Sequence, residues 1–399
     1  MMLFNTERLL SKMKEHNLSA IVAATKENIK YFTGFEPVVK TLNPYFGQCF
    51  AVITSCAPDK VHIVHSVGEI DQILDARVPI GEVITYGTFY REYGADTPLT
   101  EDEQRLNDLS NHDNGNVNAE EGLVALIHKL NLASERVGID EDGMRGSRLS
   151  MIKSKLPQVE WVESSAVIRS VRAVKTSFEI EALAYSSICI EKAIKTVIDQ
   201  LYEGINEQEI VKIFSCSIAE QGAVATLPMI KVGRHAVGGQ RKPSADNRLM
   251  PGDILWFDCD IVCDGYWADI ARVFAYKELK AEYLKYNALH KGQQEAIKRV
   301  KPGMKGKDVF HLTMNAVHEA GFESYRRHHV GHGIGLEPYE LPILSPASDD
   351  VIEEGMVLSI ETPYYEFGLG ALHVEDPIVV LQSGNKILTT GDSLIKIVG

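Results

Sequence analysis

The sequence lacks several features that would place it in other classes of protein. No apolar stretch approaches the roughly 20 residues that a membrane-spanning helix needs, so we expect no membrane association. Charged side chains between Glu7 and Glu15 interrupt the N-terminal segment, which argues against a signal peptide and predicts a cytoplasmic protein. Positive charge is also scarce, because 41 Lys and Arg face 55 Asp and Glu. The resulting net charge of −14 argues against nucleic acid as a partner.

Cysteine is sparse as well. The six cysteines form no CxxC pair and no zinc-finger spacing, so we expect reduced and mostly buried thiols. No low-complexity bias is present, and the 45% hydrophobic and 24% charged content is typical of a globular protein. A chain of 399 residues exceeds the about 250–300 residues at which a single core usually stops growing. The length therefore predicts two domains.

The first part of the chain alternates helical and strand patterns. An amphipathic run covers 6–15, an apolar strand covers 20–24, and a further apolar run, 29–32, ends at Gly34. Strand-like runs follow at 137–139 and 159–161. These patterns predict an α/β domain over residues 1–168.

Two further segments complete this outline. The acidic stretch 95–121 is poor in apolar residues, and we interpret it as a surface excursion without a core element. A helix is predicted to begin with an N-cap at Thr176 or Ser177, supported by Glu179. We therefore expect a second domain over residues 169–399.

The second domain contains an internal repeat. Residues 204–223 align without gaps to residues 303–322, and both segments read as amphipathic helices that end at a glycine. Each copy leads to a strand that starts at a glycine, Gly252 or Gly355. An acid, Asp258 or Glu361, stands six positions later. The repeat predicts two similar units that each place a carboxylate on a strand.

Each of these strands is followed by a turn and a second acid. A symmetric hairpin around 262–265 would set Asp258 opposite Asp269, with the two Cβ atoms roughly 5 Å apart. In the second copy, Gly368 is the midpoint between Glu361 and Glu375. We expect two hairpins that each present a facing pair of carboxylates.

Four like charges on one sheet surface would repel one another unless cations compensate them. His332 lies between the copies, flanked by glycines that allow close backbone packing. Four carboxylates and an imidazole suit two divalent ions such as Mn²⁺, Fe²⁺, Co²⁺ or Zn²⁺. Such ions would lie about 3.5–4 Å apart with hydroxide between them. This chemistry favours hydrolysis of an amide or ester.

The same five residues resemble the ligand set of the pita-bread metallopeptidases, which include aminopeptidase P, prolidase, methionine aminopeptidase and the metal-free creatinase. The matching segments are DCDIVCDGYWADIARVF, HHVGHGIGL, LSIETPYY and LHVEDPIVV. The segment ERLLSKMKEHNLSAIVAATKENIKYFTGF is similar to the start of the creatinase/prolidase N-terminal domain, which methionine aminopeptidases lack. The resemblance implies an α+β pita-bread catalytic domain, with duplicated helix and hairpin units around a curved antiparallel sheet, behind an N-terminal creatinase-like α/β domain.

The resemblance also implies roles for these residues. Asp269 and Glu375 would bridge two metal ions, Asp258 would complete one site, and His332 with Glu361 would complete the other. Glu361 would additionally serve as general base. The implied enzyme is an Xaa-Pro dipeptidase or aminopeptidase, with manganese as the first choice of metal and homodimer formation through the N-terminal domain.

Accessory residues are also implied. His328 matches a histidine that lines the substrate pocket of the family. Tyr339 and His373 stand where these peptidases usually carry a histidine and an arginine, and Gln240 stands near the place of a further histidine, with His235 close by. We expect His328, Tyr339 and His373 to orient the substrate.

The three departures leave the substrate open. One interpretation is an ordinary Xaa-Pro peptidase in which the replacements are tolerated. Another is a metal-dependent hydrolase of a specialised small amide, because groups around the metals decide specificity. A third is a binding protein that retains the fold without the chemistry, although all five ligand positions are intact.

Overall fold

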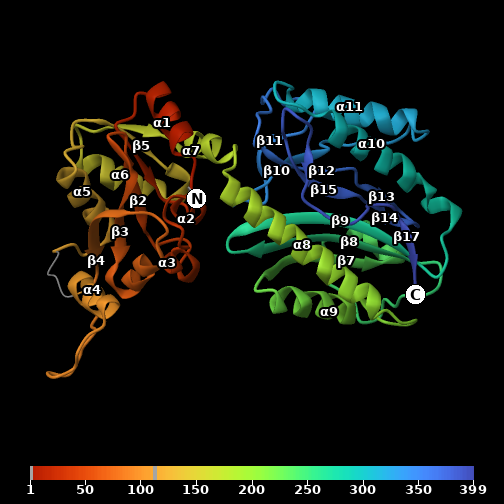
Figure 1. Cartoon of the computed structure of the whole chain (residues 1–399), viewed down its shortest axis with the longest axis horizontal. Helices are drawn as coiled ribbons and strands as arrows, with labels where there is room; N and C mark the ends of the chain where they lie inside the picture. The colour runs from red at the N-terminus through yellow and green to blue at the C-terminus, as the bar shows by residue number, and fades with distance from the viewer. Residues whose placement is uncertain (1–2, 111–114) are drawn as a thin grey trace. The chain divides into compact units, whose positions relative to one another are not determined.

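The structure is a computed structural model that describes residues 3–110 and 115–399 (Figure 1). The first two residues and the middle of the acidic 95–121 stretch lie outside the described residues. The described chain divides between Arg172 and Ala173 into two compact units.

The first unit is built on a six-stranded mixed sheet with the order β4-β3-β2-β1-β5-β6. Strand β1 pairs antiparallel with β2 and parallel with β5, and the apolar side chains of these strands pack against α5 and α6. This arrangement confirms the predicted α/β architecture. The elements are α1 Thr6–Glu15, β1 Ala20–Ala23, α2 Lys26–Thr33, α3 Val38–Leu42, β2 Phe50–Thr54, β3 Ala57–Ser66, η1 Val67–Asp75, β4 Ile80–Tyr86, α4 Glu101–Ser110, α5 Ala119–Lys129, β5 Arg136–Ile139, η2 Glu141–Gly143, α6 Gly146–Lys155, β6 Glu160–Glu163 and α7 Ser165–Arg172.

The acidic stretch is more structured than predicted. Its described part contains the helix α4, which is exposed along most of its length, and the start of α5. Ala119 in that first turn of α5 is only 2% exposed and belongs to the core. The prediction of a segment without a core element is therefore wrong at its C-terminal end. The low apolar content hid the start of a helix whose buried residues lie mainly beyond residue 121.

The second unit contains a nine-stranded sheet whose main path is β11-β10-β12-β15-β9-β8-β7, antiparallel throughout. Helices α8 and α9 pack against the β7–β9 part, and α10 and α11 pack against the β12–β15 part (Figure 1). The elements are α8 Ser177–Asp199, α9 Glu207–Glu220, β7 Val224–Val232, η3 Gly233–Gly238, β8 Ile254–Cys263, β9 Tyr266–Tyr276, η4 Ala281–Leu284, α10 Lys285–Arg299, α11 Gly306–Glu319, β10 Gly331–Gly333, β11 Glu340–Ile343, β12 Val357–Glu361, β13 Tyr364–Glu366, β14 Gly370–Leu372, β15 Glu375–Val379, β16 Lys386–Ile387 and β17 Lys396–Val398.

Helix α8 starts with the predicted cap. The Thr176 hydroxyl accepts a hydrogen bond from the Glu179 backbone N–H at 3.3 Å, and the Glu179 carboxylate accepts one from the Thr176 N–H at 2.9 Å. This reciprocal pair is a capping box, which satisfies two backbone donors that the first helical turn leaves free. The Glu179 residue is only 2% exposed.

The internal repeat is visible in the backbone. At the start of both α9 and α11 a carboxylate, Glu209 or Asp308, accepts the backbone N–H of the residue three positions earlier. Each helix is followed by a glycine with positive φ, Gly222 at 75° and Gly321 at 97°. The glycines that launch β8 and β12 also match, with φ of 82° at Gly252 and 86° at Gly355. Because such φ values favour glycine, the repeated glycines mark the same turn in both copies.

Two expectations concern the whole chain, namely the absence of a membrane-spanning helix and the burial of the cysteines. In the part of the chain that the structure describes, no helix is both long and apolar enough to cross a membrane. Cys49, Cys189 and Cys259 are buried free thiols, whereas Cys56 and Cys216 are exposed and Cys263 is half-buried. The expectation of mostly buried thiols therefore holds for only half of the cysteines.

Candidate metal centre

The acidic residues lie in one row across four neighbouring strands. Asp258 on β8 pairs with Ala271 on β9, Ala271 pairs with Glu375 on β15, and Glu375 pairs with Glu361 on β12. Paired residues of a sheet project from the same face, so three carboxylates meet there. The predicted pairing of Glu361 with Glu375 around Gly368 is confirmed.

The other predicted pairing is wrong. Asp269 faces Asp260, not Asp258, because the β8–β9 hairpin closes one residue later than expected. Its turn residues Asp264 and Gly265 have φ of 46° and 82°, as a two-residue type I′ turn requires. Asp258 and Asp269 still share a face, since each lies two residues from the partner of the other.

His332 reaches the same cluster from β10. Its Nδ1 lies 2.9 Å from the Gly333 carbonyl oxygen, an arrangement that places the proton on Nδ1 and leaves Nε2 as a free base. That Nε2 lies 3.9 Å from oxygens of both Asp269 and Glu375. The neighbouring Gly331 is needed for this approach, because a Cβ there would stand 2.1 Å from the Ser359 carbonyl oxygen.

Because the cluster is buried, it is unfavourable for all of its carboxylates to be ionised at once. Burial and neighbouring carboxylates raise the pKa values of Asp269 and Glu375 well above the usual range. Burial, followed by the charge of Asp258, raises the pKa of Asp260 to about 7. These acids resist ionisation together, so cations in their midst would stabilise the carboxylates.

At Glu361, two histidines lower the pKa, opposite to the effect of burial. Burial alone would raise the pKa of Glu361, but His329 and His373 outweigh it and hold the pKa well below its usual range. The His329 Nδ1 lies 2.8 Å from Glu361 Oε1, although the two atoms do not meet at a hydrogen-bonding angle. In turn, burial opposes protonation of His373, yet Asp258 and Glu361 outweigh burial and raise the pKa of His373 to about 10.

Several atoms of the cluster are buried without a hydrogen-bond partner among the described residues, namely Asp269 Oδ1, Glu361 Oε1 and His332 Nε2. Buried polar atoms normally have partners, and unpaired lone pairs that converge are typical of a metal site. Two overlapping groups have ligand atoms within 4.8 Å of one another: Asp258, His373 and Glu375, and Asp269, His332 and Glu375. The residues present therefore fit divalent metal ions.

A cavity of about 640 Å³ opens onto this cluster. Its wall includes His328 and Tyr339, which are expected to orient the substrate, and also Gln240. The Tyr339 ring stacks on His332, with ring centroids 3.7 Å apart and planes 18° from parallel. The described wall residues are Met229, Val237, Gly238, Gly239, Gln240, Arg241, Trp256, Asp258, Arg327, His328, His329, Tyr339, Glu361 and Tyr365.

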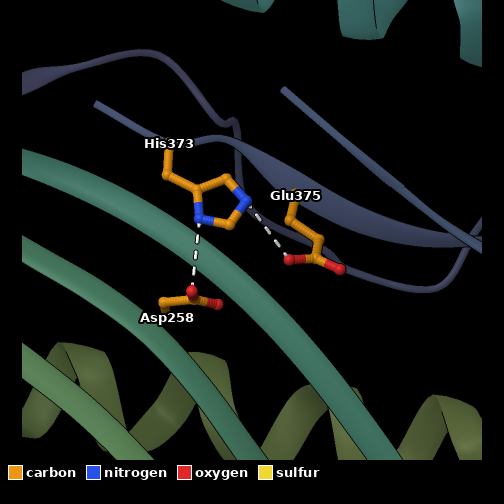
Figure 2. Close-up of side chains that lie close together, drawn as sticks. All are labelled: Asp258, His373 and Glu375. Carbon is orange, nitrogen blue, oxygen red and sulfur yellow. Dashed lines mark ion pairs between the residues drawn. The ribbon is translucent and has the colours of Figure 1, made fainter. Parts of the chain in front are cut away.

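The structure thus brings together all five residues predicted as metal ligands. His373 lies among the carboxylates and is not one of the described wall residues, so its role in orienting the substrate stays a prediction (Figure 2). His235 is exposed and also absent from the described wall.

Sequence reasoning missed two residues at the centre, Asp260 and His329. Asp260 follows Asp258 by two positions and therefore shares its face of β8, a signal that the strand period already contained. His329 has no comparable signal. Its contact with Glu361 depends on how the segment before β10 packs against β12, which the local sequence does not specify.

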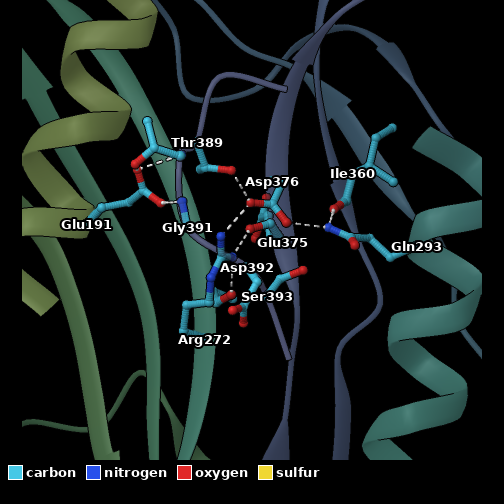
Figure 3. A network of polar contacts seen from close by, with 12 residues as sticks. Glu191, Arg272, Gln293, Ile360, Glu375, Asp376, Thr389, Gly391, Asp392 and Ser393 are labelled. Atoms are coloured by element: carbon cyan, nitrogen blue, oxygen red, sulfur yellow. Dashed lines mark hydrogen bonds and ion pairs between the residues drawn. The ribbon is translucent and has the colours of Figure 1, made fainter. Parts of the chain in front are cut away.

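Hydrogen bonds and an ion pair around Asp376 hold the strand that carries Glu375 (Figure 3). Arg272 donates to the Glu375 carbonyl oxygen at 2.7 Å and forms a buried ion pair with Asp376 at 2.5 Å. Gln293 on α10 donates to the other Asp376 oxygen at 2.8 Å, and the Thr389 hydroxyl donates to the first at 2.6 Å. Because both oxygens of Asp376 accept hydrogen bonds, the residue helps to fix the strand that carries the ligand.

Comparison with known proteins agrees with this architecture. A model of metallopeptidase family M24 matches residues 181–382, and a model of the creatinase/prolidase N-terminal domain matches residues 6–174. An uncharacterized peptidase of Staphylococcus aureus (strain bovine RF122 / ET3-1) is 30% identical over 266 residues, which are 66% of this chain and 74% of that protein.

Two solved structures share the fold. The Xaa-Pro dipeptidase from Bacillus anthracis is 21% identical with a TM-score of 0.79, and the match covers 98% of this chain and 99% of that one. The X-Pro aminopeptidase from Thermotoga maritima MSB8 is 21% identical with a TM-score of 0.77, and the match covers 99% of both chains. Identities at this level concern the fold and leave the substrate to the residues of the site.

Proposed function

Because the chain belongs to metallopeptidase family M24, we propose that it uses two divalent metal ions to cleave the amide bond of Xaa-Pro dipeptides or short Xaa-Pro peptides. One observation carries the proposal: a buried cluster of carboxylates and imidazoles opens directly onto a cavity of about 640 Å³. Cavities of this size hold small ligands such as dipeptides.

Five residues would hold the ions. These are Asp258, Asp269, His332, Glu361 and Glu375. Manganese is our first choice, with iron, cobalt or zinc as alternatives. When bound, the ions supply Lewis-acid activation of the scissile carbonyl and of water.

The chain itself handles the proton. The low pKa of Glu361 keeps it ionised at neutral pH, so it can accept the proton of the attacking water and return it to the leaving amine. Asp258 and Glu361 are the two carboxylates of this set that reach the cavity wall. Glu361 is therefore placed to contact the reacting atoms.

Other wall residues would orient the substrate. The exposed His328 and the Tyr339 hydroxyl supply hydrogen bonds, and Arg241 and Arg327 supply positive charge for the free carboxylate of a short peptide. Water would be excluded from one side of the centre by Trp256, which is 1% exposed.

The test is a substrate panel. Metal-free protein would be reloaded with Mn²⁺ and assayed by amine release from Xaa-Pro dipeptides, longer Xaa-Pro peptides, dipeptides without proline and non-peptide amides. We expect turnover of the Xaa-Pro substrates and a loss of roughly 10²–10⁴-fold in kcat for Glu361→Gln, the range for removal of a general base. Hydrolysis that persists in this variant at the native rate would contradict the assignment.

A second candidate function is hydrolysis of a specialised small amide. It is favoured by Tyr339 stacked on His332 and by Gln240 on the cavity wall, since these positions depart from the peptidase pattern. Turnover of a non-peptide amide without turnover of Xaa-Pro dipeptides would select this function. Absence of both activities and of bound metal would instead select the binding-protein alternative.

We also propose that the chain forms a homodimer. Sedimentation equilibrium would report twice the chain mass of 44.3 kDa if this is correct and the single-chain mass if it is not.

A further inference from the structure

The imidazole of His373 lies at the centre of the carboxylate cluster. It follows β14 and is 2% exposed, and its Nδ1 is 3.5 Å from Asp258 Oδ2. Its Nε2 is 3.2 Å from Glu361 Oε2 and 3.4 Å from Glu375 Oε2. Figure 2 shows the ring between Asp258 and Glu375, with one nitrogen directed at each.

These separations are too long for ordinary charged hydrogen bonds, which measure about 2.7–2.9 Å. Neither ring nitrogen has a hydrogen-bond partner among the described residues. Two ligand atoms of one tetrahedral ion, each bound at about 2.0–2.2 Å, lie roughly 3.3–3.6 Å apart. One ion can bind only one of the two ring nitrogens. The separations of 3.2 and 3.4 Å from Nε2 to the oxygens of Glu361 and Glu375 are close to those of atoms that share a metal ion, and one ring nitrogen lies within 4.8 Å of ligand atoms of both Asp258 and Glu375.

The surroundings of His373 support the same role. Trp256 stacks on one side of the ring, with centroids 6.5 Å apart and planes 23° from parallel, which restricts its rotation. The ring does not line the described part of the substrate cavity, so it is poorly placed to contact a substrate. A buried imidazole aimed at carboxylates has the geometry of a ligand.

We propose that His373 is a direct ligand of the metal ion held by Asp258 and Glu375, an inference that rests on the proposed metal centre. Each of the two ions then has one imidazole, His332 for one and His373 for the other. An arginine at position 373 would be permanently charged and could not bind a metal ion.

This assignment changes the expected metal preference. Imidazole favours Zn²⁺, Co²⁺ and Fe²⁺, whereas an all-oxygen site favours Mn²⁺. The ion beside Asp258 should consequently bind Co²⁺ more tightly, relative to Mn²⁺, than an all-oxygen site would. Replacement of His373 should weaken Co²⁺ binding more than Mn²⁺ binding.

The experiment measures metal binding on the full-length protein. Chains stripped with EDTA would be titrated with Co²⁺ and with Mn²⁺ by calorimetry, bound metal would be counted by elemental analysis, and the visible spectrum of the Co²⁺ form would report its ligands. The variants are His373→Ala, His373→Gln and His373→Arg. The matched control is His328→Ala, which removes a histidine of the cavity wall.

We expect wild-type protein and the control to bind two Co²⁺ ions per chain. The His373 variants should lose at least about tenfold in Co²⁺ affinity at one of the two sites, with a changed visible spectrum and a smaller loss for Mn²⁺. Circular dichroism of the metal-free chains checks folding, and His373→Gln serves if His373→Ala does not fold.

The outcomes separate the two proposals. If wild type binds two ions and the His373 variants retain both its Co²⁺ affinity and its spectrum, His373 is not a ligand while the metal centre stands. Weaker binding with an unchanged spectrum likewise overturns direct ligation. If wild type binds neither metal, the proposed function itself fails.

Discussion

Glu179, in the capping box of helix α8, should make the stability of the protein depend on pH. Its carboxylate accepts the Thr176 N–H and is 2% exposed. Burial is the main cause that raises the pKa of Glu179 to about 7, against an ordinary value of 4.5. The substitution Glu179→Gln keeps an acceptor for the same N–H but removes the titrating group.

The sign and size of the effect follow from the raised pKa. Between pH 4.5 and 7 the unfolded chain releases the Glu179 proton while the folded chain retains it, so native stability falls as pH rises through this window. Each pK unit corresponds to about 1.4 kcal/mol, which gives a penalty of up to about 3 kcal/mol above pH 7. The Gln variant lacks the penalty, and we expect it to be roughly 1–3 kcal/mol more stable at pH 8 but nearly equal to wild type at pH 4.5.

Urea unfolding in EDTA at several pH values between 4.5 and 8 would measure the difference, with tryptophan emission, which includes that of the buried Trp256, as the signal. Glu209→Gln is the matched control, because Glu209 makes the same capping bonds at the start of α9 but is exposed. We expect no comparable gain for the control. Parallel stability curves for wild type and Glu179→Gln across this range would refute the reasoning.

Three further predictions concern the metal centre and its support. Replacing Gln293 with Leu removes the amide that donates to Asp376, so we expect the free energy of unfolding in urea to fall by about 1–3 kcal/mol and metal binding, measured by calorimetry, to weaken roughly tenfold. Unchanged metal affinity would contradict a supporting role for Gln293. At Gly331, where φ is 142°, the Cβ of Gly331→Ala would stand 2.1 Å from the Ser359 carbonyl oxygen, so we expect this variant to have a clearly lower melting temperature. The control Gly146→Ala should keep the native melting temperature, because no atom lies within 4 Å of its Cβ position. Removal of divalent metal with EDTA should abolish amide hydrolysis, and added Mn²⁺ should restore it; activity that survives verified metal removal would contradict the proposed chemistry.

The repeat explains why much of the second unit could be predicted from the sequence. Glycines at equivalent places in both copies mark where helices end and strands begin, and Gly252 and Gly355 both adopt the positive φ that such turns require. The pairing of Glu361 with Glu375 followed from a hairpin centred on Gly368. In these segments, local backbone requirements and the spacing of acids determine the register.

The error in the first hairpin came from misplacing its turn by one residue. The Asp264-Gly265 dipeptide favours a type I′ turn, and the observed pairing of Cys263 with Tyr266 follows directly from it. A midpoint between two acids assumes that they face each other, whereas the turn chemistry determines the register. Reading the turn first would have placed Asp260 opposite Asp269.

Other features of the centre depend on tertiary packing and lie beyond local sequence patterns. The approach of His329 to Glu361 joins two segments 32 positions apart, and the insertion of His373 among the carboxylates requires both hairpins to be in place. The sequence shows that His373 stands where these peptidases usually carry an arginine, but it does not show which residues surround this side chain. Only the assembled sheet shows which side chains share the buried space.

The network behind Glu375 has a consequence for the interpretation of genetic variation. Thr389 bonds to Asp376, and the adjacent Thr390 and Gly391 bond to Glu191 on α8, so this short segment connects the ligand strand to a distant helix (Figure 3). None of these residues is among the described residues of the cavity wall. A substitution at the half-buried Thr389 would remove the hydrogen bond to Asp376 and loosen the strand that positions a metal ligand, although Thr389 lies away from the described cavity wall. Inactivating alleles should therefore cluster in this segment as well as around the acids themselves.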